Sequence, residues 1–212
     1  MILVSQMLAF LGAILYGSFF EWFVHKHFMH STKWLREPFE RHAILHHGMQ
    51  RSLRSFFARP SDNPQYMLIE ASFFPFVWLL HVPLYLGIDH FVAHHTGIGI
   101  ALGTACYCAA YEFVHWCEHV PRDRWIERTR AFRFLLEHHR VHHLYPKKNY
   151  NVVFPLADWI LGTLSLERLG PEPDPDTLPE HIRRKLDAGP KMGHKPVMPG
   201  APRKKDRRPT TL

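Results

Sequence analysis

Three long stretches without lysine or arginine limit how this chain can fold more than any other feature. They cover residues 1–25, 60–121 and 149–167, whereas all 26 basic residues lie in blocks at 26–59, 122–148 and 168–208. Membrane proteins show this separation, because their apolar helices lie in lipid and their basic loops gather on one side of the bilayer. The pattern predicts a membrane protein and argues against a nucleic-acid-binding one.

Three apolar runs inside these stretches are long enough to cross a bilayer as helices. They cover residues 2–20, 66–88 and 96–116. Each is about 20 residues long, the length that a helix needs to span the hydrocarbon core. The run at 2–20 has no basic start and no A-x-A-like cleavage site, so we expect a retained anchor rather than a signal peptide.

The second and third runs carry residues with positional meaning. Pro75 and Pro83 are expected to kink the second run. Gly99 and Gly103 form a G-x-x-x-G step, which predicts close contact between the third run and another helix.

Three spans would place residues 89–95 on the side of the N-terminus and the basic blocks on the other side, which the positive-inside rule makes cytoplasmic. We therefore expect an all-α integral membrane helical bundle of about three to four spans with a cytosolic helical cap. A soluble domain with three buried helices is the alternative, but so short a chain could hardly bury them. Residues 1–168 would form the membrane-embedded domain, and the Pro-rich, basic segment 169–212 a disordered tail.

The three cysteines predict neither disulfides nor a thiolate metal site. Cys106 and Cys108 lie in an apolar run, Cys117 follows it, and no C-x-x-C pair occurs. Buried free thiols are expected instead.

Twelve of the 18 histidines fall into four short clusters on the basic side of the predicted spans, and ten of these are candidate ligands. The clusters are HKHFMH at 25–30, HAILHH at 42–47, HWCEH at 115–119 and HHRVHH at 138–143. Neutral imidazole binds iron, zinc and copper well. Because zinc normally takes four ligands, ten histidines indicate a dinuclear centre.

Helix geometry suggests how the clusters divide between two ions. His42 and His46 lie about 40° apart around an α-helix and His47 roughly 100° further on, so one turn could serve both ions. His25 and His30 lie about 140° apart. We expect these two to bind different ions or to lie where the helix unwinds.

The last cluster gives the same picture, because His139, His142 and His143 cover an arc of about 100° that could straddle two ions. His115 and His119 repeat the i, i+4 step of His42 and His46.

A fifth cluster serves as an internal control. HFVAHH at 90–95 has the letter pattern of HAILHH, but the predicted spans place it about 30 Å of hydrocarbon away from the other clusters. We therefore interpret His90, His94 and His95 as surface histidines. His81 falls within a span, where a hydrogen bond between helices is expected.

The four clusters, followed by NYNVVFPLADWILGT, resemble the fatty acid hydroxylase and sterol desaturase superfamily of membrane di-iron enzymes over about residues 17–165. The resemblance implies a di-iron site that uses O2 to oxidise an unactivated C–H bond of a lipid. It also implies the metal ligands, which are His25, His30, His42, His46, His47, His115, His119, His139, His142 and His143. His27 and His138 lie beside ligands; a supporting or surface role is as good an interpretation for them as ligation, and they are left out of the ligand set.

Substrate and reaction type stay open at this point. Hydroxylation of a fatty acyl or related chain is the favoured reaction, with hydroxylation or desaturation of a sterol or carotenoid as the alternative. Since no G-x-G-x-x-G motif or further domain is present to carry a flavin or haem, a separate electron-donor protein is expected. The basic residues at 122–148 could receive an acidic donor.

Three other functions fit the residues less well. A soluble di-iron carboxylate protein needs two E-x-x-H steps, and only Glu112 with His115 supplies one. A zinc hydrolase would not need so many histidines. A non-catalytic metal-binding membrane protein would place ligands within its spans.

Several carboxylates could orient the ligand imidazoles, although ordinary exposed carboxylates are an equal alternative for each. These are Glu21, Glu112, Glu118, Glu137 and Asp158.

Overall fold

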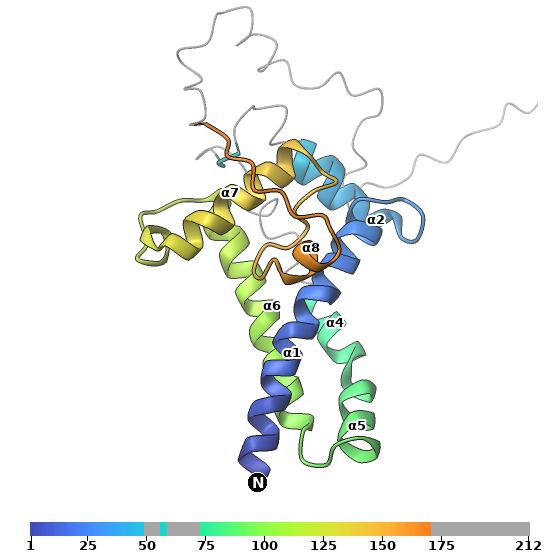
Figure 1. Cartoon of the computed structure of the whole chain (residues 1–212). Coiled ribbons are helices and arrows are strands. Elements are labelled where there is room, and N and C mark those ends of the chain that lie inside the picture. The colour runs from blue at the N-terminus through green and yellow to red at the C-terminus, as the bar shows by residue number, and fades with distance from the viewer. Residues whose placement is uncertain (49–55, 59–72, 171–212) are drawn as a thin grey trace, which may run out of the picture.

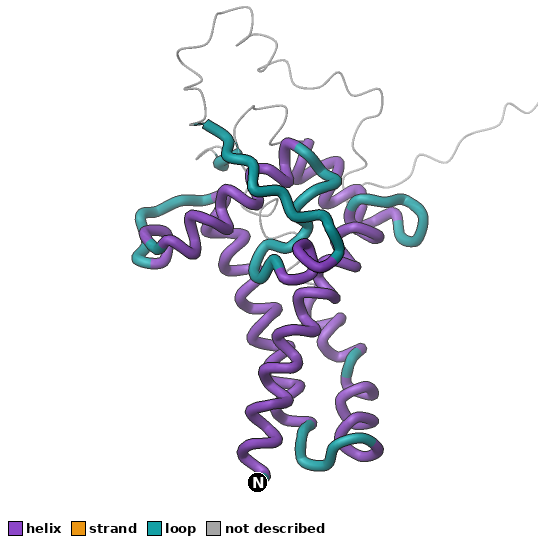
Figure 2. The backbone as a smooth tube through the Cα atoms, viewed as in Figure 1, coloured by secondary structure: helices purple, strands orange, loops and turns teal. Residues whose placement is uncertain are grey.

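The computed structural model describes residues 1–48, 56–58 and 73–170. Within these ranges the fold is all-helical, with no strand (Figure 2). A narrow stem of helices carries a wider cap, and the N-terminus lies at the end of the stem far from the cap (Figure 1). The expected all-α class is thereby confirmed for the described residues.

The two long helices of the stem are α1 (Ile2–Val24) and α6 (Gly97–His119). Their backbones approach closely because glycine faces the partner helix. A Cβ atom on Gly99 would lie 2.2 Å from the carbonyl oxygen of Gln6, and one on Gly103 would lie 2.7 Å from the Cβ of Ala13. The close helix contact predicted from the G-x-x-x-G step is confirmed.

Two shorter helices complete the stem. They are α4 (Phe73–Leu80) and α5 (Val82–Phe91), which meet at His81, just before Pro83. The break is the kink expected at Pro83, since proline lacks a backbone donor. The first part of the predicted span at 66–88 lies outside the described residues.

The cap joins segments that are distant in sequence. It holds two π-helical turns, η1 (His25–Met29) and η2 (Glu40–His46), with the short helix α2 (Arg36–Phe39) before η2. A 3₁₀ turn, η4 (Ile126–Arg128), precedes α7 (Arg130–Leu144), and α8 (Leu156–Ile160) closes the cap. The chain after α7 folds back over the end of α1, as Figure 1 shows.

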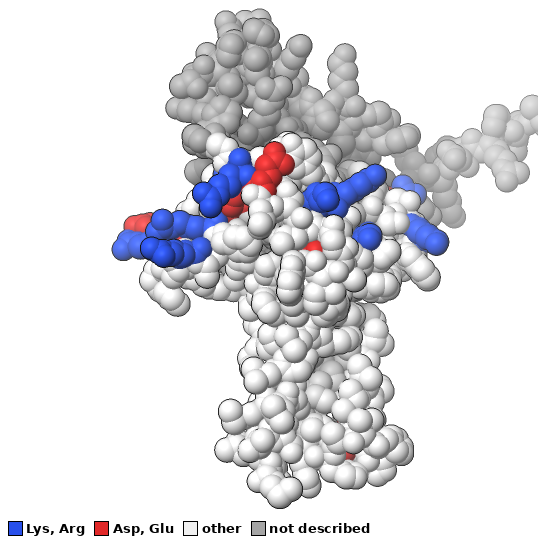
Figure 3. Space-filling model, viewed as in Figure 1, with Lys and Arg blue, Asp and Glu red and all other residues white. Residues whose placement is uncertain are grey.

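Within the described residues, two helical segments are long and apolar enough to cross a membrane, Ile2–Met29 and Gly97–His119. Their apolar side chains are largely outward-facing: Leu3 is 72% exposed and Ile98 68%. In the visible face of Figure 3, lysine and arginine occur only on the cap and the stem is almost uncharged. This surface suits lipid around the stem and water around the cap.

Candidate metal centre

The structure brings ten histidines together at the base of the cap, in two groups of five. In each group one ligand nitrogen per residue lies within 4.8 Å of all the others. All ten are buried except His30, which is half-buried. The first histidine group is His25, His30, His42, His47 and His142, and the second histidine group is His46, His115, His119, His139 and His143.

The two π-helical turns determine which histidines share a group. In η1 the backbone N–H of His30 donates to the carbonyl of His25 at 3.0 Å, a bond between residues five apart. This i→i+5 winding brings residues five apart to one side of the turn. His25 and His30 therefore lie in one group, and the prediction that they bind different ions was wrong. The other alternative, a helix end that unwinds at these residues, is closer to the π-helical turn observed.

The second π-helical turn changes the expected division of its cluster in the same way. His42 shares the first histidine group with His47, five residues on, and His46 belongs to the second. One turn does face both groups, as expected, but α-helical geometry had paired His42 with His46. π-Helical turns are rare in proteins overall, but those that occur often lie at functional sites.

The two groups adjoin each other. The rings of His47 and His143, one from each group, stack with centroids 4.1 Å apart and planes at 7°. Helix α7 also contributes to both, with His142 in the first histidine group and His139 in the second. This contact allows two neighbouring ions, one in each histidine group.

Backbone carbonyls orient several imidazoles by accepting from Nδ1. His25 donates to the carbonyl of Tyr150 at 2.5 Å, His142 to that of Lys148 at 2.7 Å and His119 to that of Phe56 at 2.8 Å. With the proton held on Nδ1, the lone pair of Nε2 is directed into the group.

The Nε2 atoms of histidines in the same group then face one another. His25 and His42 approach to 2.8 Å, and His119 and His139 to 3.1 Å. Burial lowers the pKa of four of these histidines well below its usual range, and their histidine neighbours lower it further; they are His42, His47, His139 and His143. Neutral imidazoles with converging lone pairs suit a metal cation.

Asp158 fixes the loop that supplies two of these carbonyls. It accepts from the backbone N–H groups of Tyr150 at 2.9 Å and Asn151 at 2.7 Å, from Thr163 Oγ1 at 2.6 Å and from His138 Nε2 at 3.1 Å. Burial alone would raise the pKa of Asp158, but these hydrogen bonds outweigh burial and lower it. Asp158 therefore lies at this position as a carboxylate.

Glu21 ties the same loop to the stem. Its carboxyl group accepts from Tyr107 Oη at 2.6 Å, from Asn151 Nδ2 at 3.1 Å and from the backbone N–H of Val152 at 2.5 Å. Because Glu21 belongs to α1 and Tyr107 to α6, this network joins α1, which leads directly into His25 of η1, to α6, which carries His115 and His119.

The comparison with protein families supplies the decisive observation. Residues 10–163, which contain both histidine groups, match the family model described as fatty acid hydroxylase. The chain belongs to the fatty acid hydroxylase family. No curated protein and no solved structure matched the chain.

Membership of the fatty acid hydroxylase family confirms the resemblance inferred from the sequence. The family is in general a group of membrane oxidoreductases, typically dependent on a metal, and it suggests lipid oxidation. The histidine groups of this chain are compatible with that chemistry. Five nitrogen ligands in each exceed the four that zinc normally takes.

The other histidines of the described residues lie apart from both groups. His138 is held by Asp158, and His27 packs on the rings of Trp22 and Phe23 at centroid distances of 6.0 and 5.0 Å. His81 Nε2 lies 2.9 Å from Tyr16 Oη, the kind of bond between helices that its position predicted. The end of α5 and the α5–α6 connection lie at the far end of the stem (Figure 1), and their histidines are exposed: His90 in α5, and His94 and His95 in the connection.

The other three carboxylates do not orient a ligand through a hydrogen bond within the described part of the chain. Glu118 is fully buried and its carboxyl oxygens have no hydrogen-bond partner there, and the same holds for the oxygens of Glu112. Glu137 pairs with Arg140 at 2.8 Å. Of the five carboxylates suggested by the sequence, Asp158 and Glu21 are thus the two that support the site.

Sequence reasoning missed the backbone acceptors entirely, because any residue type supplies a carbonyl. One signal was present at the start of the loop. Asn149 has a positive φ of 54° and donates from its side chain to the carbonyls of His138 and Ser165. Asparagine is one of the few residues that adopt this conformation readily, so an Asn-rich segment after the last cluster indicates a shaped loop.

Proposed function

We propose that this protein is a membrane di-iron oxygenase that hydroxylates a fatty acyl or related lipid chain, with the ten histidines of the two groups as iron ligands. One observation carries the proposal. Four segments far apart in the sequence converge on two adjoining clusters of five imidazole nitrogens each, and nine of the ten histidines are buried. Such a set has a clear purpose only around two cations, because so many neutral imidazoles gain nothing from facing one another.

Bound iron would supply the reduction of O2 and the removal of hydrogen from an unactivated C–H bond. In the overall reaction a C–H bond, O2, two electrons and two protons give an alcohol and water. The electrons come from a separate carrier protein. The exposed basic residues of the cap, Arg122, Arg128 and Arg130 among them, favour an acidic one.

The chain itself would contribute the ligands, their orientation and the exclusion of water. Carbonyls of the loop after α7 hold two imidazoles of the first histidine group, and the carbonyl of Phe56 holds one of the second. Tyr150 and Val152, 4% and 0% exposed, help to seal the site from solvent. These features fit a site that must stay dry and rigid during an oxidation.

The membrane arrangement is part of the same proposal. Helices α1 and α6 would span the bilayer and the α4–α5 pair would line them within it. The charged cap would then lie on the cytoplasmic side, in keeping with the positive-inside rule. Both histidine groups would be at the membrane surface, within reach of a lipid chain.

The test is expression of the protein and of His143→Ala in a bacterial host, with iron counted on the purified proteins and host lipids compared by mass spectrometry. We expect two irons per chain and a hydroxylated lipid that is lost with His143→Ala. The matched control is His90→Ala, which removes an exposed histidine at the far end of the stem and should change neither result. One zinc per chain and unchanged lipids would refute the proposal, and an alkene product would identify a desaturase instead.

A further inference from the structure

A wide apolar groove runs along the stem between α1 and α4, directly below the cap. It has a volume of about 710 Å³, within the range of sites for small molecules. Phe23, Phe76 and Leu80 line it and are 46%, 61% and 66% exposed. The groove is therefore open to whatever surrounds the stem, which in the proposed arrangement is the bilayer interior.

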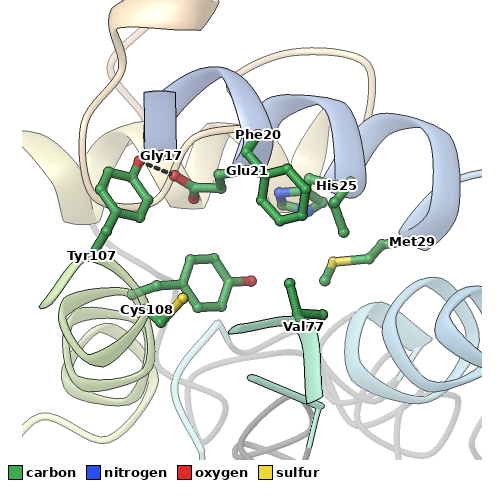
Figure 4. Close-up of a pocket in the computed structure, with 10 residues that line it drawn as sticks. Gly17, Phe20, Glu21, His25, Met29, Val77, Tyr107 and Cys108 are labelled. Carbon is green, nitrogen blue, oxygen red and sulfur yellow. Dashed lines mark hydrogen bonds between the residues drawn. The ribbon is translucent and has the colours of Figure 1, made fainter. Parts of the chain in front are cut away.

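The groove leads to a smaller inner cavity beside the first histidine group. The inner cavity has a volume of about 50 Å³ and is lined by His25 and Glu21 among others. Both spaces share the same four lining residues: Phe20, Val24, Met29 and Val77. Figure 4 shows Met29 and Val77 close together at one side of the inner cavity, with His25 above them beside Phe20.

Because the inner cavity is much smaller than the groove, it limits the shape of the molecule that can enter it. A space of about 50 Å³ holds only a few atoms, since one water already needs roughly 10–15 Å³ of such volume. A thin methylene chain fits, whereas the fused rings of a sterol do not. His81 also lines the groove, and its Nε2 lies 2.9 Å from Tyr16 Oη.

The end of the groove next to the cap is polar. Arg36, Glu37 and Arg41 line it, and Arg41 pairs with Glu37 at 3.0 Å, with side chains 38% and 75% exposed. Arg36 pairs with Glu40 at 2.6 Å, but the two side chains are 84% and 48% exposed. Exposed pairs of this kind are weak, so both arginines can turn to the phosphate of a lipid head group.

We propose that the groove is the substrate site and that its occupant is an anionic phospholipid of the bilayer, with its phosphate at Arg36 and Arg41. One unbranched acyl chain lies along α1 and passes between Met29 and Val77 into the inner cavity at His25. The proposal rests on the proposed function, because it takes the histidine groups as the place of reaction. It makes Met29 and Val77 the residues that select a linear chain over a ring.

The native thiol of Cys108 offers a direct reporter, because it lines the inner cavity. The experiment measures the rate at which a lipid-soluble alkyl methanethiosulfonate labels Cys108 in zinc-loaded, detergent-purified protein. The protein carries Cys106→Ala, which removes the exposed thiol, and Cys117 is buried. Adding dioleoyl phosphatidylglycerol should slow the labelling roughly tenfold, and dioleoyl phosphatidylcholine much less.

Variants of the opening and of its polar end test the route. Val77→Trp should block labelling of Cys108, and Val77→Ala, which introduces no bulk, should speed it. Leu79→Trp is the matched control, because Leu79 lies on the same helix, is 59% exposed and does not line the groove. Arg36→Gln with Arg41→Gln should abolish the preference for phosphatidylglycerol, whereas Arg130→Gln, an exposed arginine outside the groove, should preserve it.

The outcomes distinguish a failure of this proposal from a failure of the proposed function. Protection of Cys108 does not require turnover, so unprotected Cys108 alongside an iron-dependent lipid product would overturn the groove and leave the function standing. Stronger protection by oleate or cholesterol than by the phospholipid would overturn the assigned occupant. Unchanged labelling in both Val77 variants would overturn the route through this opening.

Discussion

Replacing Asp158 by asparagine tests how the loop after α7 holds the metal ligands. Each carboxylate oxygen of Asp158 accepts two hydrogen bonds. Oδ1 accepts from Tyr150 and Thr163, and Oδ2 accepts from Asn151 and His138. The asparagine side chain would keep one acceptor oxygen and turn an NH2 group toward two donors. Two charge-assisted bonds at about 1.5–3 kcal/mol each are lost, so Asp158→Asn should cost about 3–6 kcal/mol of loop stability.

The effect on metal binding should be unequal. The loop carbonyls of Tyr150 and Lys148 orient His25 and His142, which both belong to the first histidine group. Loss of such outer support typically costs 10–100-fold in metal affinity, so we expect roughly that loss for one ion of two. The second histidine group keeps the carbonyl of Phe56, and its ion should stay bound.

The assay is titration of metal-loaded protein with a chelator, followed by a metal count on the protein. Asp158→Asn should release one ion at a much lower chelator concentration than the other. Asp123→Asn is the control, because Asp123 pairs with Arg128 on the exposed surface of the cap. Release of both ions together at the wild-type concentration would refute the reasoning.

Two further predictions concern stability. Gly99→Ala should destabilise the stem by about 1–3 kcal/mol in thermal unfolding, because its Cβ would meet the Gln6 carbonyl, whereas Gly12→Ala, which faces open space, should not. The metal-free protein should lose stability as the pH falls below about 6.5, the pKa of histidine in the unfolded chain. Each histidine whose folded pKa is depressed should lower the free energy of unfolding by about 1.4 kcal/mol per pH unit, so the melting temperature should fall progressively. The histidines expected to cause this loss are His42, His47, His139 and His143. A melting temperature unchanged between about pH 7.5 and 5.5 would contradict the expectation.

Much of the architecture could be predicted from local pattern. The apolar runs at 2–20 and 96–116 became α1 and α6, and the glycines at 99 and 103 lie at their contact. Such features depend on side-chain hydrophobicity and size along one helix, which the sequence states directly. The ten histidines that the family resemblance implied as ligands were named from the sequence as well, and the structure places all ten together.

The division of those histidines into groups could not be predicted, because it depends on backbone winding. An α-helix places His42 beside His46, but η2 is a π-helical turn and places it with His47. The same holds for the loop carbonyls that orient His25 and His142, since their positions follow from the tertiary contacts of Asp158. These are properties of the assembled fold rather than of any one segment.

The most direct test of the di-iron centre is X-ray diffraction from crystals of the iron-loaded protein, recorded on both sides of the iron absorption edge. We expect two anomalous peaks that disappear below the edge, one within the first histidine group and one within the second. A single peak, or peaks that persist unchanged below the iron edge, would contradict a di-iron centre. Iron bound at His90, His94 and His95 instead would contradict the site itself.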